Sequence, residues 1–491
     1  MRRSKRDFVG PLRGTLPPLL VVATFQVSTV KTVPESLRVP LGEISRQLVC
    51  AALEAETKAP GLGAVEEWVM YHMFVKSVLD SATEGDKEAS AEDIRRRLGR
   101  WRRGECNSLW VECMGRSKVR QEIRGQKARQ RKTPKRPPSP DTIMKAAIRR
   151  ATGYAREGAF NKALNTLQST GLAEANEETL RCLRELHPLR AERPVVEHVG
   201  AAPRLTKDRV KEALFKFKKG TACGYSGVRV EHLQQFVEAD GTGQFLTAFT
   251  QLCNRMASGE LGASIQPFFG GAALTALIKK AGGIRPIAVG EVFRRVVGKA
   301  LLLEVREKVS EAVGRFQFGV GAQGGAQRVA HLMRRLCADR ENDTDFTVCK
   351  VDMHNAFNSA CRQAMLEALV NRGLPELVPW MSWLMKNASV LQFGEHHIAS
   401  EEGAQQGDPL GPLIFSLLIA KLTEDLGEMR VSAVEKGETL SMLAERFRVD
   451  PALLRSANVG VPLPEADDVD VSQSVHVDRR RIPCTGRSLE G

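Results

Sequence analysis

The sequence predicts an α+β protein with a helical N-terminal region, a mixed helix-and-strand region and a small C-terminal module. Over residues 41–100, apolar residues recur every three or four positions, which is the period of an amphipathic helix. From residue 207 onward, such helices alternate with short β-branched or alternating segments that are typical of strands. The 491-residue chain is 42% hydrophobic, so it can form a sizeable core, and this composition excludes wholesale disorder.

The helical N-terminal region is expected to have three parts. A helical leader covers residues 1–94, and a basic linker follows over residues 95–140, where the prolines and charges of RQRKTPKRPPSP indicate solvated chain. Residues 141–204 are predicted to contain a helical hairpin. Asp141 supplies a helix start signal there, and Gly158 falls where a helix should end.

The mixed region is expected over residues 205–427. A hairpin of two short strands around a Gly-Gly turn is predicted for ALTALIKKAGGIRPIAVG, and a long helix for VFRRVVGKALLLEVREKVSEAVG. The segment FTVCKVDM is predicted to be a strand that ends at Asp352, which would place one carboxylate at the mouth of a sheet. The segment AQQGDPLGPLIFSL reads as a turn that opens into an apolar helix.

Almost all of the net charge lies in one segment. The chain carries +14, and residues 95–136 alone account for +13, because sixteen Lys or Arg residues accompany only Glu105, Glu112 and Glu122. Such a segment most often contacts a polyanion, so a nucleic acid is the expected partner, although a solvated linker or a nuclear-import signal would have the same composition.

The residues of this segment that we expect to contact nucleic acid are Arg116, Lys118, Arg120, Arg124, Lys127, Arg129, Arg131, Lys132, Lys135 and Arg136.

Several classes of protein lack support in the sequence. No apolar run reaches the ~18 residues that a membrane span needs, so no membrane partner is expected. Residues 1–30 combine a basic head with an apolar stretch, but prolines interrupt it and no convincing cleavage site follows, so a nuclear location is favoured over secretion. The ten cysteines include no CxxC pair and no zinc-spaced Cys/His cluster, and HExxH, GxxxxGK[ST] and GxSxG are absent from the sequence.

The order of the motifs resembles the reverse transcriptase domain of non-long-terminal-repeat (LINE-like) retrotransposons. KVDMHNAFNS resembles polymerase motif A, AQQGDPLGPLIFSL resembles motif B, and IRPIAVG and FQFGVGAQGGAQ resemble the fingers motifs that precede them. KKGTACGYSGVRVEHL is similar to the segment that opens such domains. The resemblance implies fingers and a partial palm over residues 205–427. It also implies RNA-templated DNA synthesis, with an RNA or DNA template and primer and deoxynucleoside triphosphates as partners.

The resemblance assigns roles to six residues. It makes Asp352 the catalytic residue and the Mg²⁺ ligand, and it makes Phe357 the steric gate beside the position of a ribose 2′-hydroxyl. The remaining four would bind the nucleotide: Lys280 and Arg285 through its triphosphate oxygens, and Gln406 and Gly407 by shaping its pocket.

Each of these positions also has a purely structural interpretation. Asp352 or Asn355 could cap the helix that follows, Gln406–Pro409 could be an ordinary turn, and Arg285 could be a surface charge. A dinucleotide-binding fold is a further alternative, because GVGAQG fits GxGxxG. The segment GRFQF before it is a poor strand, however, and Asp352 lies further away than the spacing of that fold requires.

The C-terminal part departs from the polymerase pattern. Gly437-Glu438-Thr439-Leu440 stands where LysM modules have Gly-Asp-Thr-Leu, and Leu443, Phe447 and Leu453 fall at their core positions. Residues 431–478 therefore resemble a LysM module, a βααβ glycan-binding fold, and residues 479–491 are expected to be a tail. Motif C of the polymerase family should supply a second pair of carboxylates, and Asp467-Asp468 is the candidate, but prolines occupy its expected leading strand. The favoured function is therefore that of a retroelement-derived reverse transcriptase-like protein that is incomplete in motif C. The alternatives are a non-catalytic nucleic-acid-binding remnant and a protein that binds glycans through its tail.

Overall fold

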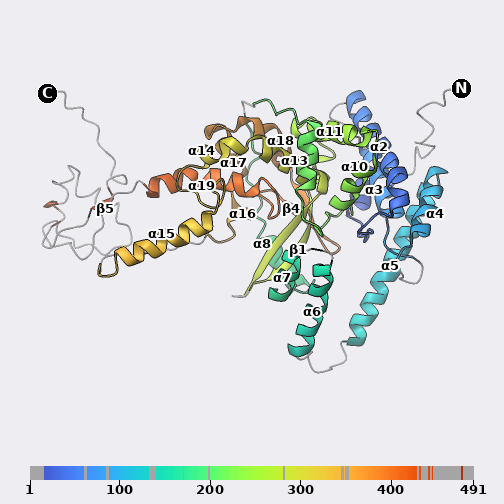
Figure 1. Cartoon of the computed structure of the whole chain (residues 1–491), viewed down its shortest axis with the longest axis horizontal. Helices are drawn as coiled ribbons and strands as arrows, with labels where there is room; N and C mark the ends of the chain where they lie inside the picture. The colour runs from blue at the N-terminus through green and yellow to red at the C-terminus, as the bar shows by residue number, and fades with distance from the viewer. Residues whose placement is uncertain are drawn as a thin grey trace. The chain divides into compact units, whose positions relative to one another are not determined.

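The computed structural model describes most of the chain up to residue 427 and short pieces beyond it (Figure 1). The described residues are 16–59, 64–83, 88–131, 140–156, 158, 160–169, 171–196, 200–279, 282–343, 348, 353–427, 431–432, 439, 441–442, 445 and 477–478. The chain divides into a larger unit, residues 1–313 and 319–418, and a smaller unit, residues 314–318 and 419–491. Within the described ranges, no helix has the length and apolar character that crossing a bilayer requires.

The N-terminal part of the larger unit is helical. Its helices are α1 Leu19–Thr24, α2 Glu35–Lys58, α3 Val65–Val78, α4 Ala91–Arg102 and α5 Cys106–Arg131. Helix α3 is surrounded by the other four, and every residue from Trp68 to Val78 is buried. The helices predicted between residues 41 and 100 are therefore confirmed.

The basic segment differs from the solvated linker that the sequence predicts. Residues 91–102 and 106–131 form the helices α4 and α5, and Trp101, Leu109 and Trp110 are buried in the main apolar core. The linker prediction is wrong for residues 95–131, because the high charge obscured apolar residues that recur on one side of each helix. Residues 132–139 lie outside the described part of the chain.

The predicted helical hairpin is present, and the chain after it joins the sheet. The helices are α6 Pro140–Arg156, α7 Phe160–Gln168 and α8 Glu177–Glu185. Helices α6 and α7 pack against each other. Residues 171–173 then run beside a strand, where Ala173 N–H donates to Ala276 O at 2.9 Å. Helix α8 packs against the sheet through Leu180 and Leu183.

The larger unit contains a four-stranded sheet. Its strands are β1 Ala272–Ile278, β2 Ile284–Gly290, β3 Ser389–Phe393 and β4 His396–Ser400. The strand order is β2-β1-β3-β4; β1 is antiparallel to β2 and parallel to β3, and β3 is antiparallel to β4. The predicted β1–β2 hairpin is confirmed, and its turn uses Gly282 and Gly283 at φ values of 87° and 79°, a region that favours glycine. Strands β3 and β4 are not among the predicted elements.

One apolar core connects the N-terminal helices to the helices around the sheet. The further helices of the described residues are α9 Lys207–Phe215, α10 Val230–Ala239, α11 Gln244–Ala257, α12 Gln266–Phe269, α13 Val292–Glu304, α14 Arg306–Val313, α15 Gly325–Asp339, α16 Ala356–Ser359, α17 Arg362–Asn371, the 3-10 helix η1 Pro375–Leu377, α18 Val378–Lys386 and α19 Gly411–Gly427. Trp68 of α3 contacts Phe269 and Phe293 edge to face, with ring centroids 4.7 and 6.1 Å apart. The long helix predicted for residues 292–314 is interrupted at Val305.

Only short pieces of the C-terminal tail are described. Strand β5, Val431–Ser432, pairs antiparallel with β6, Val477–Asp478, so the two ends of the predicted LysM-like segment meet. The remainder of the segment is largely outside the described residues, as are Asp467 and Asp468. The LysM-like fold and its glycan ligand therefore stay predictions.

Candidate functional site

The turn that follows Asp352 is anchored to the N-terminal region. Asp352 itself lies outside the described residues, and the structure resumes at Met353. Asn355 adopts a left-handed conformation (φ 52°, ψ 24°), which asparagine tolerates better than most residues. Its Nδ2 donates to Leu186 O at 2.9 Å, and its Oδ1 accepts from Asn358 Nδ2 at 2.9 Å. The end of α8 therefore holds the start of α16 in place.

The motif B turn is held by a buried ion pair. Asp408 Oδ2 accepts from Arg294 Nε at 2.8 Å, and Asp408 Oδ1 accepts from Leu410 N–H at 2.9 Å. Gln405 Nε2 donates to Gly270 O at 2.6 Å. Asp408 thus connects α13 to the start of α19. Its hydrogen bond from Leu410 N–H is also the contact that an aspartate makes at the beginning of a helix in an ordinary turn.

Motifs A and B contact each other directly. Ala404 N–H donates to Phe357 O at 2.8 Å, and the ring of Phe357 stacks on that of Phe415, with centroids 4.9 Å apart and planes 18° apart. A Cβ on Gly403 would overlap the Phe357 and Asn358 carbonyl groups, so this contact requires glycine there. Phe357 is half-buried, and its ring reaches from motif A to Phe415 of motif B.

The motif B turn also contacts strand β2. Gly407 has a φ of 112°, and a Cβ there would lie 3.1 Å from Ala288 O. Gln406, immediately before it, is half-buried, and Arg285 is exposed on β2 opposite Leu277. The structure therefore brings Phe357, the Gln406-Gly407 turn and the strand of Arg285 together. Lys280 lies outside the described residues.

Arg362 is a buried residue of this region that the sequence did not single out. Its Nε donates to Gly403 O at 3.2 Å, its Nη2 donates to Ser400 Oγ at 3.1 Å, and its backbone N–H donates to Glu402 Oε2 at 2.8 Å. Burial, followed by the positive charge of Arg294, lowers the pKa of Arg362 to about 9. No sequence signal identifies it, because its partners come from β4 and the loop after it.

The opening segment of the polymerase-like region is anchored by a buried carboxylate. Ser226 N–H donates to Glu291 Oε1 at 3.0 Å, and the Ser226 hydroxyl donates to Glu291 Oε2. Burial raises the pKa of Glu291, against the hydrogen bonds from Ser226. A Cβ on Gly224 would overlap this carboxylate, so glycine lets the segment pass close to the end of β2.

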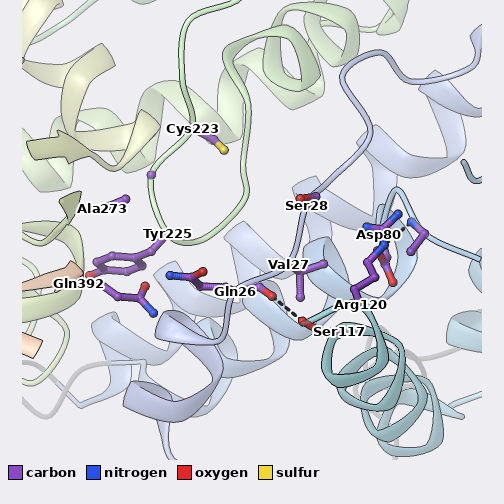
Figure 2. Close-up of a pocket in the computed structure, with 12 residues that line it drawn as sticks. Gln26, Val27, Ser28, Asp80, Ser117, Arg120, Cys223, Tyr225, Ala273 and Gln392 are labelled. Carbon is purple, nitrogen blue, oxygen red and sulfur yellow. Dashed lines mark hydrogen bonds between the residues drawn. The ribbon is translucent and has the colours of Figure 1, made fainter. Parts of the chain in front are cut away.

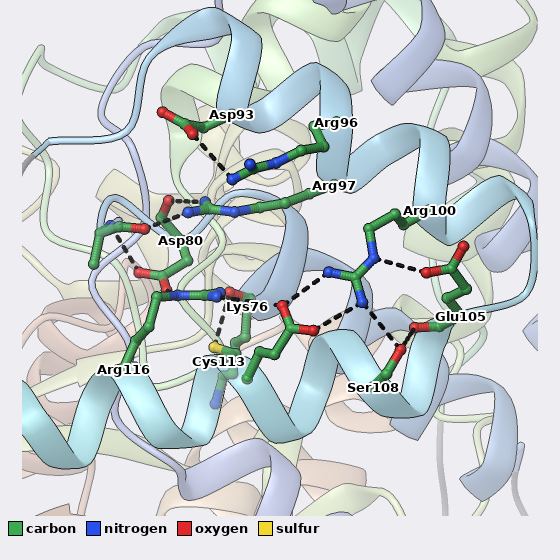
Figure 3. A network of polar contacts seen from close by, with 12 residues as sticks. Lys76, Asp80, Asp93, Arg96, Arg97, Arg100, Glu105, Ser108, Cys113 and Arg116 are labelled. Atoms are coloured by element: carbon green, nitrogen blue, oxygen red, sulfur yellow. Dashed lines mark hydrogen bonds and ion pairs between the residues drawn. The ribbon is translucent and has the colours of Figure 1, made fainter. Parts of the chain in front are cut away.

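Part of the basic segment is neutralised by ion pairs and backbone contacts (Figure 3). Arg116 Nε contacts Asp80 Oδ2 at 2.9 Å, with side chains 11% and 4% exposed. Arg97 donates to Asp80 O at 2.6 Å, and Arg100 pairs with Glu112 at 2.8 Å. The guanidinium of Arg116 is therefore held on a buried carboxylate, and its contact with phosphate stays a prediction.

The remaining basic candidates differ in how far the structure describes them. Lys118 is exposed, and Arg120 is half-buried beside a cavity. For four of them only the position on the backbone of α5 is described: Arg124, Lys127, Arg129 and Arg131. Three lie outside the described residues: Lys132, Lys135 and Arg136.

The described residues do not contain an assembled metal site. Among them, no group of three or more His, Cys, Asp or Glu side chains is placed to hold a metal ion. Asp352, the residue expected to bind Mg²⁺, is not described, so its role stays a prediction.

The dinucleotide-binding alternative is not supported by the local structure. Residues 314–318 precede the glycines of GVGAQG without forming a strand, and the helix α15 follows them. The tight strand-turn-helix that such a site requires is therefore missing here.

Comparison with known proteins, like the order of the motifs, finds similarity to reverse transcriptases. Residues 277–435 match the family "Reverse transcriptase (RNA-dependent DNA polymerase)". The chain is 26% identical over 232 residues to the retrotransposable element SLACS 132 kDa protein of Trypanosoma brucei gambiense, which covers 46% of this chain and 19% of that protein. It is 25% identical over 182 residues to the retrovirus-related Pol polyprotein from type-1 retrotransposable element R2 of Nasonia vitripennis, which covers 33% of this chain and 17% of the polyprotein.

The chain thus spans about a fifth of the length of these two relatives. The matched residues include motif A, motif B and the β2 strand, which are the parts that the structure brings into contact. The chain therefore carries a reverse transcriptase-like domain over residues 277–435, and it is similar to proteins of non-LTR retrotransposons.

Proposed function

We propose that the larger unit binds a template strand and the incoming deoxynucleoside triphosphate of RNA-templated DNA synthesis. The observation that carries this proposal is the contact of three separate segments: the turn of Phe357, the turn of Gly407 and the strand β2. A nucleotide held there would have an aromatic side chain, a polar turn and a basic hairpin around it.

Each side chain would contribute a different part of the binding. Arg285 is exposed on β2, and its guanidinium would pair with the triphosphate oxygens, helped by Lys280 across the hairpin turn. The Phe357 ring, fixed by its stacking on Phe415, would exclude a ribose 2′-hydroxyl. Gln406 and Gly407 would form the side of the pocket next to β2.

Asp352 would hold Mg²⁺, which in such reactions activates the primer hydroxyl and neutralises the phosphate charge. Asn355 fixes the turn that follows Asp352, so the chain has a defined path from Met353 onward.

A non-catalytic nucleic-acid-binding protein is the second candidate. The observation that favours it is in the sequence: Pro462 and Pro464 occupy the strand that should lead into Asp467 and Asp468. Because proline cannot donate a hydrogen bond to a central strand, this segment is a poor carrier for a second carboxylate pair. Such a protein would bind template and nucleotide without joining them.

Formation of a ternary complex tests nucleotide binding independently of catalysis. An RNA template with a dideoxy-terminated DNA primer is mixed with the full chain, and the lifetime of the complex is measured with and without the next complementary deoxynucleotide and Mg²⁺. We expect the nucleotide to lengthen the lifetime, and Arg285→Gln to weaken its effect by about tenfold, the loss of one charge-assisted contact. Arg328→Gln, on the exposed helix α15, is the matched control. A lifetime that the nucleotide does not change would contradict the proposal.

A further inference from the structure

A cavity of about 270 Å³ lies between the N-terminal helices and the sheet (Figure 2). One end is lined by Tyr225, Ala273 and Gln392, and the other end by Asp80 and Arg120. The volume is slightly below the ~300–1,000 Å³ of sites for drug-sized ligands, so the cavity has room for one small ring system. The residues that contact nucleotide in the proposed function, Phe357 and Arg285, do not line it.

The cavity opens at one end of a sheet face that has Arg285 at the other end. Along β1 and β2, exposure alternates, and directly paired residues point to the same face. Arg285 is paired with Leu277, and four residues earlier on the same face of β1 is Ala273, next to Gln392 of β3. At ~3.3 Å per residue, Ala273 and Leu277 are separated by about 13 Å. A single strand of nucleic acid that crosses this face would therefore reach from Arg285 to the cavity.

The other end of the cavity continues into the basic helix α5. Arg120 lines the cavity, and positions 124, 127 and 131 follow it at helical spacing on the same side of α5. These positions carry Arg, Lys and Arg, and the helix rises ~1.5 Å per residue, so they extend the stripe by about 16 Å. A phosphate backbone that leaves the cavity would meet this stripe next.

The polar groups of the cavity fit a base edge. Gln26 Nε2 donates to Gly394 O at 3.0 Å, and Gln392 Nε2 donates to Thr24 O. Among the described residues, neither amide oxygen accepts a hydrogen bond, so both are available to an N–H donor. The exocyclic amino groups of adenine, cytosine and guanine are such donors, whereas uracil has no amino group and offers only its ring N3–H. Tyr225 adds an aromatic wall whose hydroxyl is already bonded to Phe268 O.

We propose that this cavity binds one unpaired, amino-bearing nucleobase of a single strand that runs from the β1–β2 face to helix α5. The proposal rests on the proposed function, because the strand is the template bound there, and it adds a base-specific subsite remote from the nucleotide. Unpaired bases are ordinarily recognised in this way, by insertion into a pocket beside a backbone-binding basic surface.

Filling the cavity tests the proposal. Ala273→Phe places a large side chain in it at a strand position that accepts aromatic residues, and Ala273→Ser is the control that leaves the space open. Binding of the full chain to single-stranded RNA 12-mers is measured by fluorescence anisotropy, with an abasic site moved through the sequence. We expect one abasic position to weaken binding to the natural chain about tenfold, and A273F to bind all these RNAs with that same reduced affinity. A uracil at that position, which has no amino group, should be bound more weakly than adenine, cytosine or guanine.

Chemical protection gives a second measurement that does not depend on the folding of a variant. Cys223 lines the cavity and is half-buried, and Cys50 on α2 is a half-buried cysteine that does not line it. We expect RNA to slow the alkylation of Cys223 by iodoacetamide, read by peptide mass spectrometry, and to leave Cys50 unchanged. The same concentration of free AMP should not protect Cys223.

The contradicting outcomes are distinct. Unprotected Cys223 on an RNA-bound chain, or binding by A273F that retains its sensitivity to the abasic site, would overturn the subsite and leave the proposed function standing. Equal protection by AMP would assign the cavity to a mononucleotide and overturn the strand proposal. A natural chain that binds no RNA at all would contradict the proposed function, and the subsite with it.

Discussion

Arg294 of α13 and Asp408 of the motif B turn form an ion pair inside the larger unit. Arg294 Nη2 and Asp408 Oδ2 are 2.5 Å apart, and the two side chains are only 7% and 4% exposed. Arg294 Nη1 also donates to Gly270 O, two residues before β1. One guanidinium thus connects a helix, the beginning of the sheet and the turn that carries Gln406 and Gly407.

Breaking this pair should strongly destabilise the protein. In Arg294→Met the Asp408 carboxylate stays buried without its cation, which typically costs about 3–5 kcal/mol of the free energy of unfolding. Urea unfolding followed by circular dichroism measures the loss. Arg335→Met, which removes an exposed pair with Asp339, is the control and should change the free energy by less than about 0.5 kcal/mol. Equal losses in the two variants would contradict a special role for the buried pair.

The stability of the fold should fall as the pH is lowered below neutrality, in part through His232. His232 Nε2 donates to Val30 O at 2.7 Å, and its Nδ1 accepts from Arg229 N–H at 3.4 Å, so the ring is neutral. Burial lowers its pKa to about 4, below the ~6.5 of an unfolded chain. Between these values the unfolded state binds more protons, so the contribution of His232 is complete above pH 6.5 and is lost as the pH falls toward 4.

The size of this effect follows from the pKa difference. Between pH 7 and pH 5, protonation of the unfolded state at His232 should cost about 2 kcal/mol of the free energy of unfolding. His232→Gln should remove that part of the pH dependence, whereas His396→Gln, on the exposed end of β4, should leave it unchanged. An unaltered slope in H232Q, measured by urea unfolding at both pH values, would rule out the His232 contribution.

The parts of the fold that the sequence predicted are those with strong local patterns. The β1–β2 hairpin combines alternating apolar residues with Gly282-Gly283, and α3 is apolar over three turns. The helix α5 was missed because its many basic residues suggested solvation, although Cys106, Leu109, Trp110 and Cys113 are buried at three- and four-residue spacing. Strand β4 was missed because HHIAS has only two buried side chains and lies at the edge of the sheet.

The candidate site was predictable as a set of motifs but not as a geometry. Phe357, Gln406 and Gly407 were identified from the sequence because they lie in motifs that follow one another along the chain in the order of the polymerase family. Arg294 and Asp408 are 114 residues apart, and no local pattern indicates that they pair. Their contact depends on how α13 packs on the motif B turn, which is a tertiary relationship.

Helix α5 should supply a measurable share of the nucleic-acid affinity. Binding that neutralises phosphates releases counterions, so the logarithm of the affinity falls with the logarithm of salt concentration by about 0.7 per phosphate on single strands. Replacing Arg124, Lys127 and Arg131 with Gln should make this slope shallower by about 2. The salt dependence of RNA binding, measured by fluorescence anisotropy, gives the slope directly.

A matched variant separates position from charge. The triple change Arg149→Gln, Arg150→Gln and Arg156→Gln on α6 removes the same charge from a different helix. It should leave the slope nearly unchanged. The same decrease in both triple variants would mean that overall charge, rather than the stripe on α5, determines binding.

The chain should show little or no polymerase activity on its own, although it carries Asp352, Phe357 and Gln406. Phosphoryl transfer by this class of enzyme uses two metal ions ~3.5–4 Å apart, which need carboxylates from adjacent strands. The sequence supplies one such carboxylate in motif A, and its candidate for the second pair, Asp467-Asp468, follows two prolines. Catalytic groups that act as a unit lose most of their effect when one is absent.

Primer extension on an RNA template with Mg²⁺ or Mn²⁺ measures this directly. We expect the extension rate of the natural chain to match that of Asp352→Ala, near background, while both chains bind the template–primer equally well. Robust extension that Asp467→Ala or Asp468→Ala abolishes would establish these residues as a diverged motif C and reverse the prediction. Extension that only Asp352→Ala abolishes would mean that another carboxylate completes the metal site. In that case, scanning the acidic residues of the chain by alanine substitution would locate it, because the lost partner should reduce the rate as much as Asp352→Ala does.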